Sequence, residues 1–171
     1  LLVSTGNPER SATACDCATQ LTSVKAQRLH SEGYNIVGRY LTGTVGAGAS
    51  KVAKNISRAE AQRIFDSGMN FFAIYQDDAD WWQGHESLRE YFSYERGYDD
   101  ARKAVAAALS LGIKSGEVIY FAVDYDYMAG EIVQRVVPHF QGINDYLSSV
   151  GRPYRVGVYG ARNTCGTVWG E

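Results

Sequence analysis

The chain has 171 residues, of which 45% are hydrophobic and 21% are charged, and its formal net charge is −2. This composition is ordinary for a globular protein, and the length suffices for one domain with a real core, so disordered and fibrous classes are excluded. Its lysines and arginines are dispersed and do not form the clustered basic face that phosphate backbones require, which excludes a nucleic-acid partner.

The first part of the chain alternates between strand and helix signals. Small, β-compatible residues predict a strand at 12–16, and the apolar residues of Leu21–Glu32 have helical spacing. A β-branched and aromatic run predicts a second strand at 35–41, followed by a loop rich in Gly, Ala and Ser. Ser57 and Glu60 match a capping box, in which the hydroxyl and the carboxylate each satisfy a backbone donor, and they predict the start of a second helix.

The longest irregular connection, Asp77–Phe92, follows a third predicted strand at 70–76. A connection of this length in a compact domain is usually functional or disordered. It carries Trp81 and Trp82, which could stack on sugar faces, although tandem aromatic residues in a loop are as often local packing. Its aspartates lack the glycine and the distal glutamate of a calcium-binding loop, so we expect no metal site there.

The second part continues the alternation. Tyr94–Leu111 is predicted to form an Ala-rich helix with a narrow apolar stripe suited to close packing against a sheet. A central strand is predicted at 117–124, followed by a long helix at 129–150 that Pro138 should kink or interrupt. A fifth strand at 154–159 precedes a last helical stretch.

About five strand and helix pairs in succession indicate an α/β fold, with a parallel sheet covered by helices. Such a sheet is either open and doubly wound or closed into a barrel, and the alternation alone does not choose between them. No glycine fingerprint of dinucleotide binding follows the first strand, so no cofactor is expected. The predicted core consists of the apolar residues in the strand interiors, namely Ile36, Val37, Phe72, Ile74, Ile119, Phe121, Val123, Val156 and Val158.

The central strand changes abruptly from apolar residues into two acids. Because side chains alternate in a strand, Phe121 and Val123 fall on one face, and Asp124 and Asp126 fall on the other. A buried strand that delivers acids at its C-terminal end is a common way for an α/β fold to build an active site. In the alternative interpretation, Asp126 caps the next helix and Asp124 is a solvated turn residue.

Cysteine and histidine residues give no clear site. A disulfide from Cys15 or Cys17 to Cys165 is compatible with the sequence but not implied by it, and three cysteines are too few for a zinc site. The three histidines lie far apart in the sequence. The N-terminal residues lack a signal-peptide pattern, and no stretch approaches the roughly 20 apolar residues of a membrane span.

Segments in a fixed order along nearly the whole chain carry a family resemblance: ACD at 14–16, GYNIVGRYLTG at 33–43, KNISRAEAQRIFDSGM at 54–69, YERGYDDARKAVAAALSLGI at 94–113, VIYFAVDYD at 118–126 and YRVGVYG at 154–160. Together they resemble the bacterial glycoside hydrolase-like domain family, first catalogued as a domain of unknown function. That family is related to the family 25 lysozymes, which cleave peptidoglycan.

The resemblance implies that residues 1–171 form a single β/α barrel domain of the TIM type. It also implies an Asp at the end of the first strand and Asp-x-Glu at the end of the fourth. Asp16 and Asp124 match two of these positions, and Asp126 stands where the lysozymes have Glu. The lysozymes continue through three further βα units, so we expect either an incomplete barrel with exposed edge strands, which would favour dimerisation, aggregation or completion by another segment, or further segments of a larger polypeptide.

Hydrolysis of a glycosidic bond needs one protonated carboxylic acid and one carboxylate near the oxocarbenium-like centre. Repulsion between Asp124 and Asp126 would keep one of them protonated, which suits Asp126 as the acid and Asp124 as its partner. Asp16 would orient the sugar or the reactive water. As the alternative, Asp16 is an acid at a helix N-terminus.

Tyr159, Arg39 and Tyr75 are further candidates for hydrogen bonds to the substrate, and Trp81 and Trp82 for stacking. Tyr159 could instead be a core residue with its hydroxyl at the rim, and Arg39 could hold Asp16 ionised without touching substrate.

The sequence therefore predicts a lysozyme-like glycosidase that acts on peptidoglycan or a related cell-wall glycan without a metal or cofactor. The resemblance implies an extracellular or cell-wall location. The alternative is a catalytically degenerate barrel that binds carbohydrate or has a structural role in a larger cell-wall or effector protein.

Overall fold

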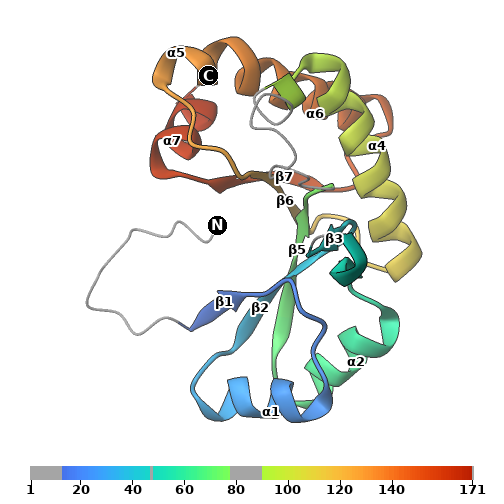
Figure 1. Cartoon of the computed structure of the whole chain (residues 1–171). Coiled ribbons are helices and arrows are strands. Elements are labelled where there is room, and N and C mark those ends of the chain that lie inside the picture. The colour runs from blue at the N-terminus through green and yellow to red at the C-terminus, as the bar shows by residue number, and fades with distance from the viewer. Residues whose placement is uncertain (1–12, 47, 78–89, 171) are drawn as a thin grey trace.

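A five-stranded parallel sheet forms the centre of the computed structural model, which describes residues 13–46, 48–77 and 90–170 (Figure 1). The strands lie side by side in chain order, and each pairs in parallel with the next. This order confirms the predicted α/β sheet and is that of a partial TIM-like barrel. In the described part of the chain the barrel is not closed, and β1 and β7 form the two edges. The strands are β1 Ala14–Asp16, β2 Ile36–Tyr40, β5 Asn70–Tyr75, β6 Val118–Val123 and β7 Arg155–Gly160.

Helices connect the strands and lie around the sheet, with α1 and α2 at one end of the view and α5, α6 and α7 at the other (Figure 1). They are α1 Ser23–Ser31, α2 Arg58–Asp66, α4 Tyr94–Leu111, α5 Ala129–Glu131, α6 Val137–Ser149 and α7 Arg162–Gly170. A π-helical turn at Ile132–Val136 joins α5 to α6 directly before Pro138. Proline has no N–H and its ring crowds the preceding turn, so the wider turn is the predicted interruption of this helix.

A small insertion separates β2 from α2. It consists of the two-residue strands β3 Thr44–Val45 and β4 Val52–Ala53, which pair antiparallel, and a 3₁₀ turn at Gly48–Ser50. The chain was predicted to form a Gly-, Ala- and Ser-rich loop here, and the short ladder lies within that loop. Its consequence is that Lys54, directly after β4, is brought back to the sheet.

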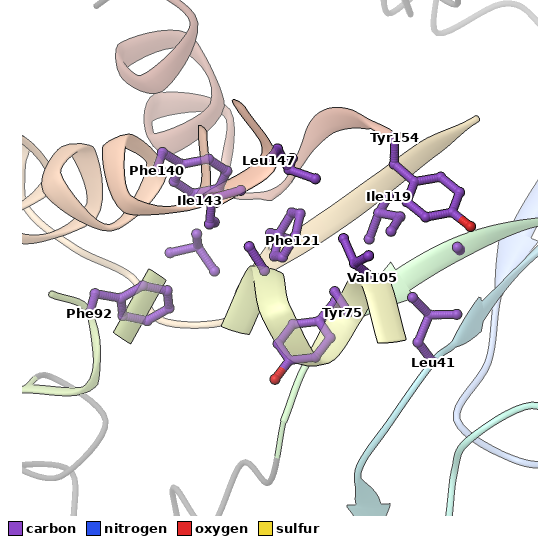
Figure 2. Packing of buried hydrophobic residues seen from close by; sticks show 14 of the residues in the cluster. Leu41, Tyr75, Phe92, Val105, Ile119, Phe121, Phe140, Ile143, Leu147 and Tyr154 are labelled. Carbon is purple, nitrogen blue, oxygen red and sulfur yellow. The ribbon is translucent and has the colours of Figure 1, made fainter. Parts of the chain in front are cut away.

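The larger of two hydrophobic clusters lies between the sheet and helices α4 and α6. Figure 2 shows Phe121 of β6 surrounded by Phe140, Ile143 and Leu147 of α6. The helices approach closely, because a Cβ at Gly97 of α4 would collide with the backbone of α6. Gly97 of α4 and Gly142 of α6, which have no side chain, make this approach possible.

The smaller cluster joins β1 and β2 to α1 and α2 through Leu21, Val37, Ile56, Ile64 and Met69. Five of the nine predicted core residues are confirmed as buried, namely Val37, Ile74, Ile119, Phe121 and Val123, whereas Ile36, Phe72, Val156 and Val158 are only half-buried. Phe72 lies on the inner face of the curved sheet, where its ring meets the edge of Tyr120. That face has no helix layer over it in the described fold, which is why alternation alone overestimated the burial of Phe72.

A buried ion pair links β2 to α2. Both side chains, Arg39 and Glu60, are 0% exposed, and the guanidinium Nε lies 2.7 Å from Glu60 Oε1 while Nη2 lies 3.3 Å from Oε2. This two-point geometry matches the planar fork of arginine to a carboxylate. Burial leaves each charge dependent on the other, since neither can recover its hydration.

The same pair fixes three backbone segments. Arg39 donates to the carbonyl oxygens of Cys17 and of Lys54, the latter at 3.0 Å. Glu60 Oε1 accepts from the Leu21 N–H at 2.8 Å. The predicted capping box is therefore only half correct, because Ser57 accepts from the Glu60 N–H but the Glu60 carboxylate is used by Arg39 and Leu21.

A second buried polar group, Asp100 of α4, lies behind β5. It accepts from the Tyr75 hydroxyl at 3.1 Å and from the Tyr91 hydroxyl at 2.8 Å, and its Oδ2 lies 3.7 Å from His139 Nε2. Burial raises the pKa of Asp100 to about 6 and lowers the pKa of His139 to about 4. At neutral pH His139 is therefore uncharged, so this contact is not an ion pair.

Replacing Glu60 with Gln should destabilise the fold strongly, because it leaves the Arg39 guanidinium buried without a counter-charge. We expect a loss of about 3–5 kcal/mol in the free energy of unfolding, measured by urea denaturation. The matched control is Glu32→Gln in the exposed pair between Arg28 and Glu32, which should change stability by no more than about 0.5 kcal/mol. Equal losses in the two variants would contradict the assigned role of the buried pair.

The pH dependence of stability tests the Asp100 and His139 environments. Because the pKa of Asp100 is raised, the free energy of unfolding should fall as pH rises from about 4 to 6. In this range the carboxyl has lost its proton in the unfolded state but keeps it in the folded state. The lowered pKa of His139 makes stability rise between about pH 4 and 6.5, because the unfolded state binds this proton first. The two contributions oppose each other in the wild type.

Replacing Asp100 with Asn should leave only the histidine contribution in this window. Stability of the variant should therefore rise more steeply than that of the wild type between pH 4 and 6.5, as measured by urea denaturation at several pH values. If stability changes with pH equally steeply in the variant and the wild type, Asp100 does not oppose the contribution of His139.

Candidate functional site

Polar side chains from four strand ends meet on the inner face of the sheet, at its C-terminal end. Asp16 is the last residue of β1, and Asp124 directly follows β6. Tyr40 ends β2, and Tyr159 lies in β7. In parallel sheets the C-terminal ends of the strands share one edge, so these residues meet although they are far apart in the sequence.

The Asp16 carboxylate is held by two tyrosines. Tyr40 donates its hydroxyl toward Oδ2 and Tyr159 toward Oδ1, each at 3.4 Å. Burial raises the pKa of both tyrosines, and the charge of Asp16 raises them further, so both hydroxyls remain protonated donors. Since β1 and β7 are the opposite edges of the sheet, the contact between Asp16 and Tyr159 shows that the sheet curls toward closure.

The Asp124 carboxylate is held by a different set of residues. Gln76, directly after β5, donates from Nε2 to Asp124 Oδ2 at 3.2 Å. The Gln76 Oε1 atom accepts from Lys54 Nζ at 2.8 Å, and the same ammonium lies 4.5 Å from the centre of the Tyr40 ring. The negative charge of Asp124 also contributes to the raised pKa of Tyr40 and Tyr159, which places both carboxylates in one cluster.

We call these six residues the cleft cluster: Asp16, Tyr40, Lys54, Gln76, Asp124 and Tyr159. Three of them, Asp16, Asp124 and Tyr159, are among the predicted site residues. Side-chain alternation positions Tyr159, because Gly157 on the same face lies against the Tyr120 ring, where a Cβ would collide. The glycine thus leaves room for the Tyr120 ring on the inner face.

Asp126 is exposed, and the structure records no hydrogen bond or ion pair between its side chain and another described residue. It lies two residues beyond Asp124, after β6 has ended, so strand alternation no longer fixes its direction. The structure therefore brings Asp16 and Asp124 into one cluster but does not join Asp126 to it.

Two further predicted residues lie on the other face of the sheet. Arg39 is buried against Glu60, and Tyr75 is 2% exposed, with its hydroxyl on Asp100. Arg39 and Tyr75 therefore belong to the helix-covered side, which corrects the expectation that they face the substrate. Trp81 and Trp82 lie outside the described residues.

Tyr40, Lys54 and Gln76 were missed by sequence reasoning. Tyr40 and Gln76 directly follow Arg39 and Tyr75 in the sequence. The strands were therefore predicted correctly, but the residues selected on them face the opposite side of the sheet. The signal that could have found them is their parity with Asp16, because Asp16 pairs with Gly38 and Tyr40 is two residues further along β2. Lys54 follows a two-residue strand, for which periodicity gives no signal.

A small cavity of about 30 Å³ is lined by residues of both polar groups. Gln76 and Asp124 of the cleft cluster line it together with Tyr75, Asp100 and His139 of the buried polar group behind β5. Its volume suits about one water molecule and excludes a sugar ring. A glycan would have to lie on the open inner face.

Within the described ranges, no group of three or more His, Cys, Asp or Glu side chains is arranged to hold a metal ion. The helices of the described part are all too short or too polar to cross a membrane. Cys15, Cys17 and Cys165 are all free thiols, so neither disulfide that the sequence allowed is formed.

Comparisons with known proteins agree with this architecture. Two proteins of Bacillus subtilis (strain 168), both described as uncharacterized, match nearly the whole chain. FadG is 43% identical over 169 residues, covering 98% of this chain and 28% of its own length. YbfG is 42% identical over 170 residues, covering 96% of this chain and 22% of its own length. The chain thus spans about a quarter of the length of these relatives.

Solved structures show the same fold. The crystal structure of the Mycobacterium tuberculosis Tat-secreted protein Rv2525c, in complex with HEPES, matches with a TM-score of 0.70 at 20% identity, covering 91% of this chain and 71% of that one. An uncharacterized B. stearothermophilus protein matches with a TM-score of 0.57 at 26% identity, covering 85% and 58%.

The family model described as "Rv2525c-like, glycoside hydrolase-like domain" matches residues 27–170, which include all the strands except β1. The chain therefore belongs to the family of Rv2525c-like, glycoside hydrolase-like domains.

Proposed function

We propose that this domain is a lysozyme-like glycosidase that acts on peptidoglycan or a related cell-wall glycan. One observation carries the proposal: Asp16 and Asp124, from different strand ends, share a polar cluster on the open inner face of a parallel β/α sheet. This is the end of such a sheet where catalytic residues gather in barrel enzymes. The glycoside hydrolase-like family of the chain supports the same class of chemistry.

The proposed mechanism gives the three acids different roles. Asp124 would stabilise or attack the oxocarbenium-like centre, and Asp126 would protonate the leaving oxygen. Asp16 would orient a sugar hydroxyl or the reactive water, because Tyr40 and Tyr159 already fix both of its oxygens as acceptors. A separation of roughly 5–5.5 Å between the Asp124 and Asp126 carboxyls in the glycan complex would favour retention, and roughly 6.5–9.5 Å inversion.

A glycan fits the cleft cluster in chemical terms. Carboxylate oxygens accept hydrogen bonds from sugar hydroxyls, and the Tyr159 hydroxyl can both donate to and accept from a ligand. The half-buried ring of Tyr159 also lies on the inner face, where a sugar ring can pack against it.

The second candidate function is glycan binding without turnover. It is favoured by the position of Asp126, which is exposed and is not joined to the described cluster. Its side chain is one methylene shorter than the Glu of the related lysozymes, and a misplacement of about 1 Å can reduce a rate on the order of a hundredfold. In this case Asp16 and Asp124 would serve only as ligands for hydroxyl groups.

We further propose that residues 1–171 act as one domain and that it works outside the cytoplasm. The Tat-secreted character of Rv2525c supports the location. The long Bacillus subtilis relatives, of which the chain spans about a quarter, support a role within larger polypeptides.

The decisive test is turnover of purified peptidoglycan, followed by the release of reducing ends. Asp124→Asn and Asp126→Asn keep the side-chain shape while removing the charge or the proton, so each should lower kcat by about 10²–10⁴-fold with an unchanged fold. Asp66→Asn, on the exposed side of α2, is the matched control and should leave the rate unchanged.

Asp126→Glu tests the shorter acid directly. If its length limits turnover, the variant should be faster than the wild type, on the order of tenfold or more. Saturable glycan binding by the wild type and by Asp126→Glu, with no reducing ends from either, would rule out the glycosidase and support the binding function.

A further inference from the structure

Lys54 is the buried cation of the cleft cluster, and none of the roles proposed above uses it. Its residue is 3% exposed, although lysine is rarely buried without partners. The backbone is fixed on both sides, because the Lys54 N–H donates to the Gly43 carbonyl oxygen at 3.1 Å and the Lys54 carbonyl oxygen accepts from Arg39. The short β3–β4 ladder and the buried ion pair thus deliver one ammonium to the inner face.

The side chain of Lys54 is also guided by its surroundings. A Cβ at Gly43 would lie 2.6 Å from Lys54 Cε and 2.8 Å from the backbone carbonyl oxygen of Gln76, so no larger residue fits there. Gly43 also has φ +89°, a conformation that other residues rarely adopt. The stem of Lys54 therefore passes through a gap that the glycine keeps open.

Lys54 determines which way the side-chain amide of Gln76 is turned. An ammonium can only donate, so the Gln76 carbonyl oxygen Oε1 must face Lys54, at 2.8 Å. The Gln76 NH₂ group is then turned toward Asp124 Oδ2, at 3.2 Å, and Asp124 must accept. Without the cation the amide could turn over and present its oxygen to the carboxylate, which would repel it.

We infer that Lys54 is a positioning residue that acts through Gln76 to hold Asp124 as the hydrogen-bond-accepting carboxylate of the site. This inference rests on the proposed function and deepens it, because it assigns the acceptor role to Asp124 and leaves the proton-donor role to another acid. It also makes Asp124 Oδ1 the oxygen that accepts from the glycan. In this role Lys54 acts on Asp124 through the Gln76 amide and not through the substrate.

The same cation also bears on Asp16. It lies 4.5 Å from the centre of the Tyr40 ring, and the Tyr40 hydroxyl donates to Asp16 Oδ2. A cation over an aromatic face is attracted by the ring, which fixes the ring plane as well as the ammonium. Lys54 is thus connected to both carboxylates through one intermediate side chain each.

The first experiment measures solvent exchange of the Gln76 side-chain NH₂ protons by NMR, using the 171-residue chain. A hydrogen bond to a charged group contributes about 1.5–3 kcal/mol, so Lys54→Met should speed this exchange by roughly tenfold or more. The matched control is Lys114→Met, at an exposed lysine outside the cleft cluster, which should leave the exchange unchanged. Lys54→Arg keeps a cation and should retain most of the protection.

The second experiment is a double-mutant cycle on kcat and KM for peptidoglycan, with Lys54→Met, Gln76→Leu and both together. If Lys54 acts through Gln76, removing both side chains breaks the same series of contacts as removing one of them. The double variant should therefore be no slower than the slower single variant. The loss should appear in kcat, by roughly 10–100-fold, with KM changed less than about threefold, because only the placement of Asp124 is altered.

The outcomes are separable. Unchanged Gln76 exchange in Lys54→Met, or additive losses of kcat in the cycle, would overturn the positioning role. Faster Gln76 exchange in a protein whose wild type releases no reducing ends would support the positioning role and reject the glycosidase. If Lys54→Met does not fold, Lys54→Arg decides: exchange as fast as in the free glutamine side chain would overturn the inference, and slow exchange would support it.

Discussion

The buried ion pair between Arg39 and Glu60 is the constraint on which the rest of this structure depends. One guanidinium holds the carbonyl oxygen next to Asp16 and the carbonyl oxygen of Lys54, and its carboxylate partner holds the backbone at the start of α1. Two of the three segments that carry charge into the cleft, those of Asp16 and Lys54, are therefore fixed to the same guanidinium. A buried ion pair contributes little net stability, and the contacts of this one fix the relative placement of an acid and a cation.

The sequence predicted the sheet well, because five apolar runs alternating with helices leave few other folds, and it placed Asp16 and Asp124 at the correct end. On two strands, however, the residue predicted to face the site was next to the one that does. Arg39 and Tyr75 were chosen for their chemistry, but a shift of one position moves a side chain to the opposite face, and their neighbours Tyr40 and Gln76 face the cleft. Lys54 could not be predicted, because its placement depends on a two-residue strand and on a long-range contact with Arg39.

The two carboxylates of the cleft, Asp16 and Asp124, have hydrogen-bond partners of different kinds. In the part of the chain that the structure describes, Asp16 accepts hydrogen bonds from two neutral tyrosine hydroxyls, whereas Asp124 is connected to a full positive charge through the Gln76 amide. This asymmetry gives the acids distinct environments although both lie at strand ends of one sheet. The contact from Tyr159 to Asp16 also joins the two edge strands through side chains, where the described sheet has no backbone pairing.

The two hydrophobic clusters of unequal size have a consequence for motion. Asp124 and Tyr159 come from strands packed on the larger cluster, whereas Asp16 and Tyr40 come from strands packed on the smaller one. Sub-global opening follows the weaker packing, so the β1–β2 segment should exchange its amide protons before β5–β7 and α4 do. The assembled cleft would then have a shorter lifetime than the fold that carries it, and a glycan that bridges Asp16 and Asp124 would slow the exchange of the β1–β2 segment.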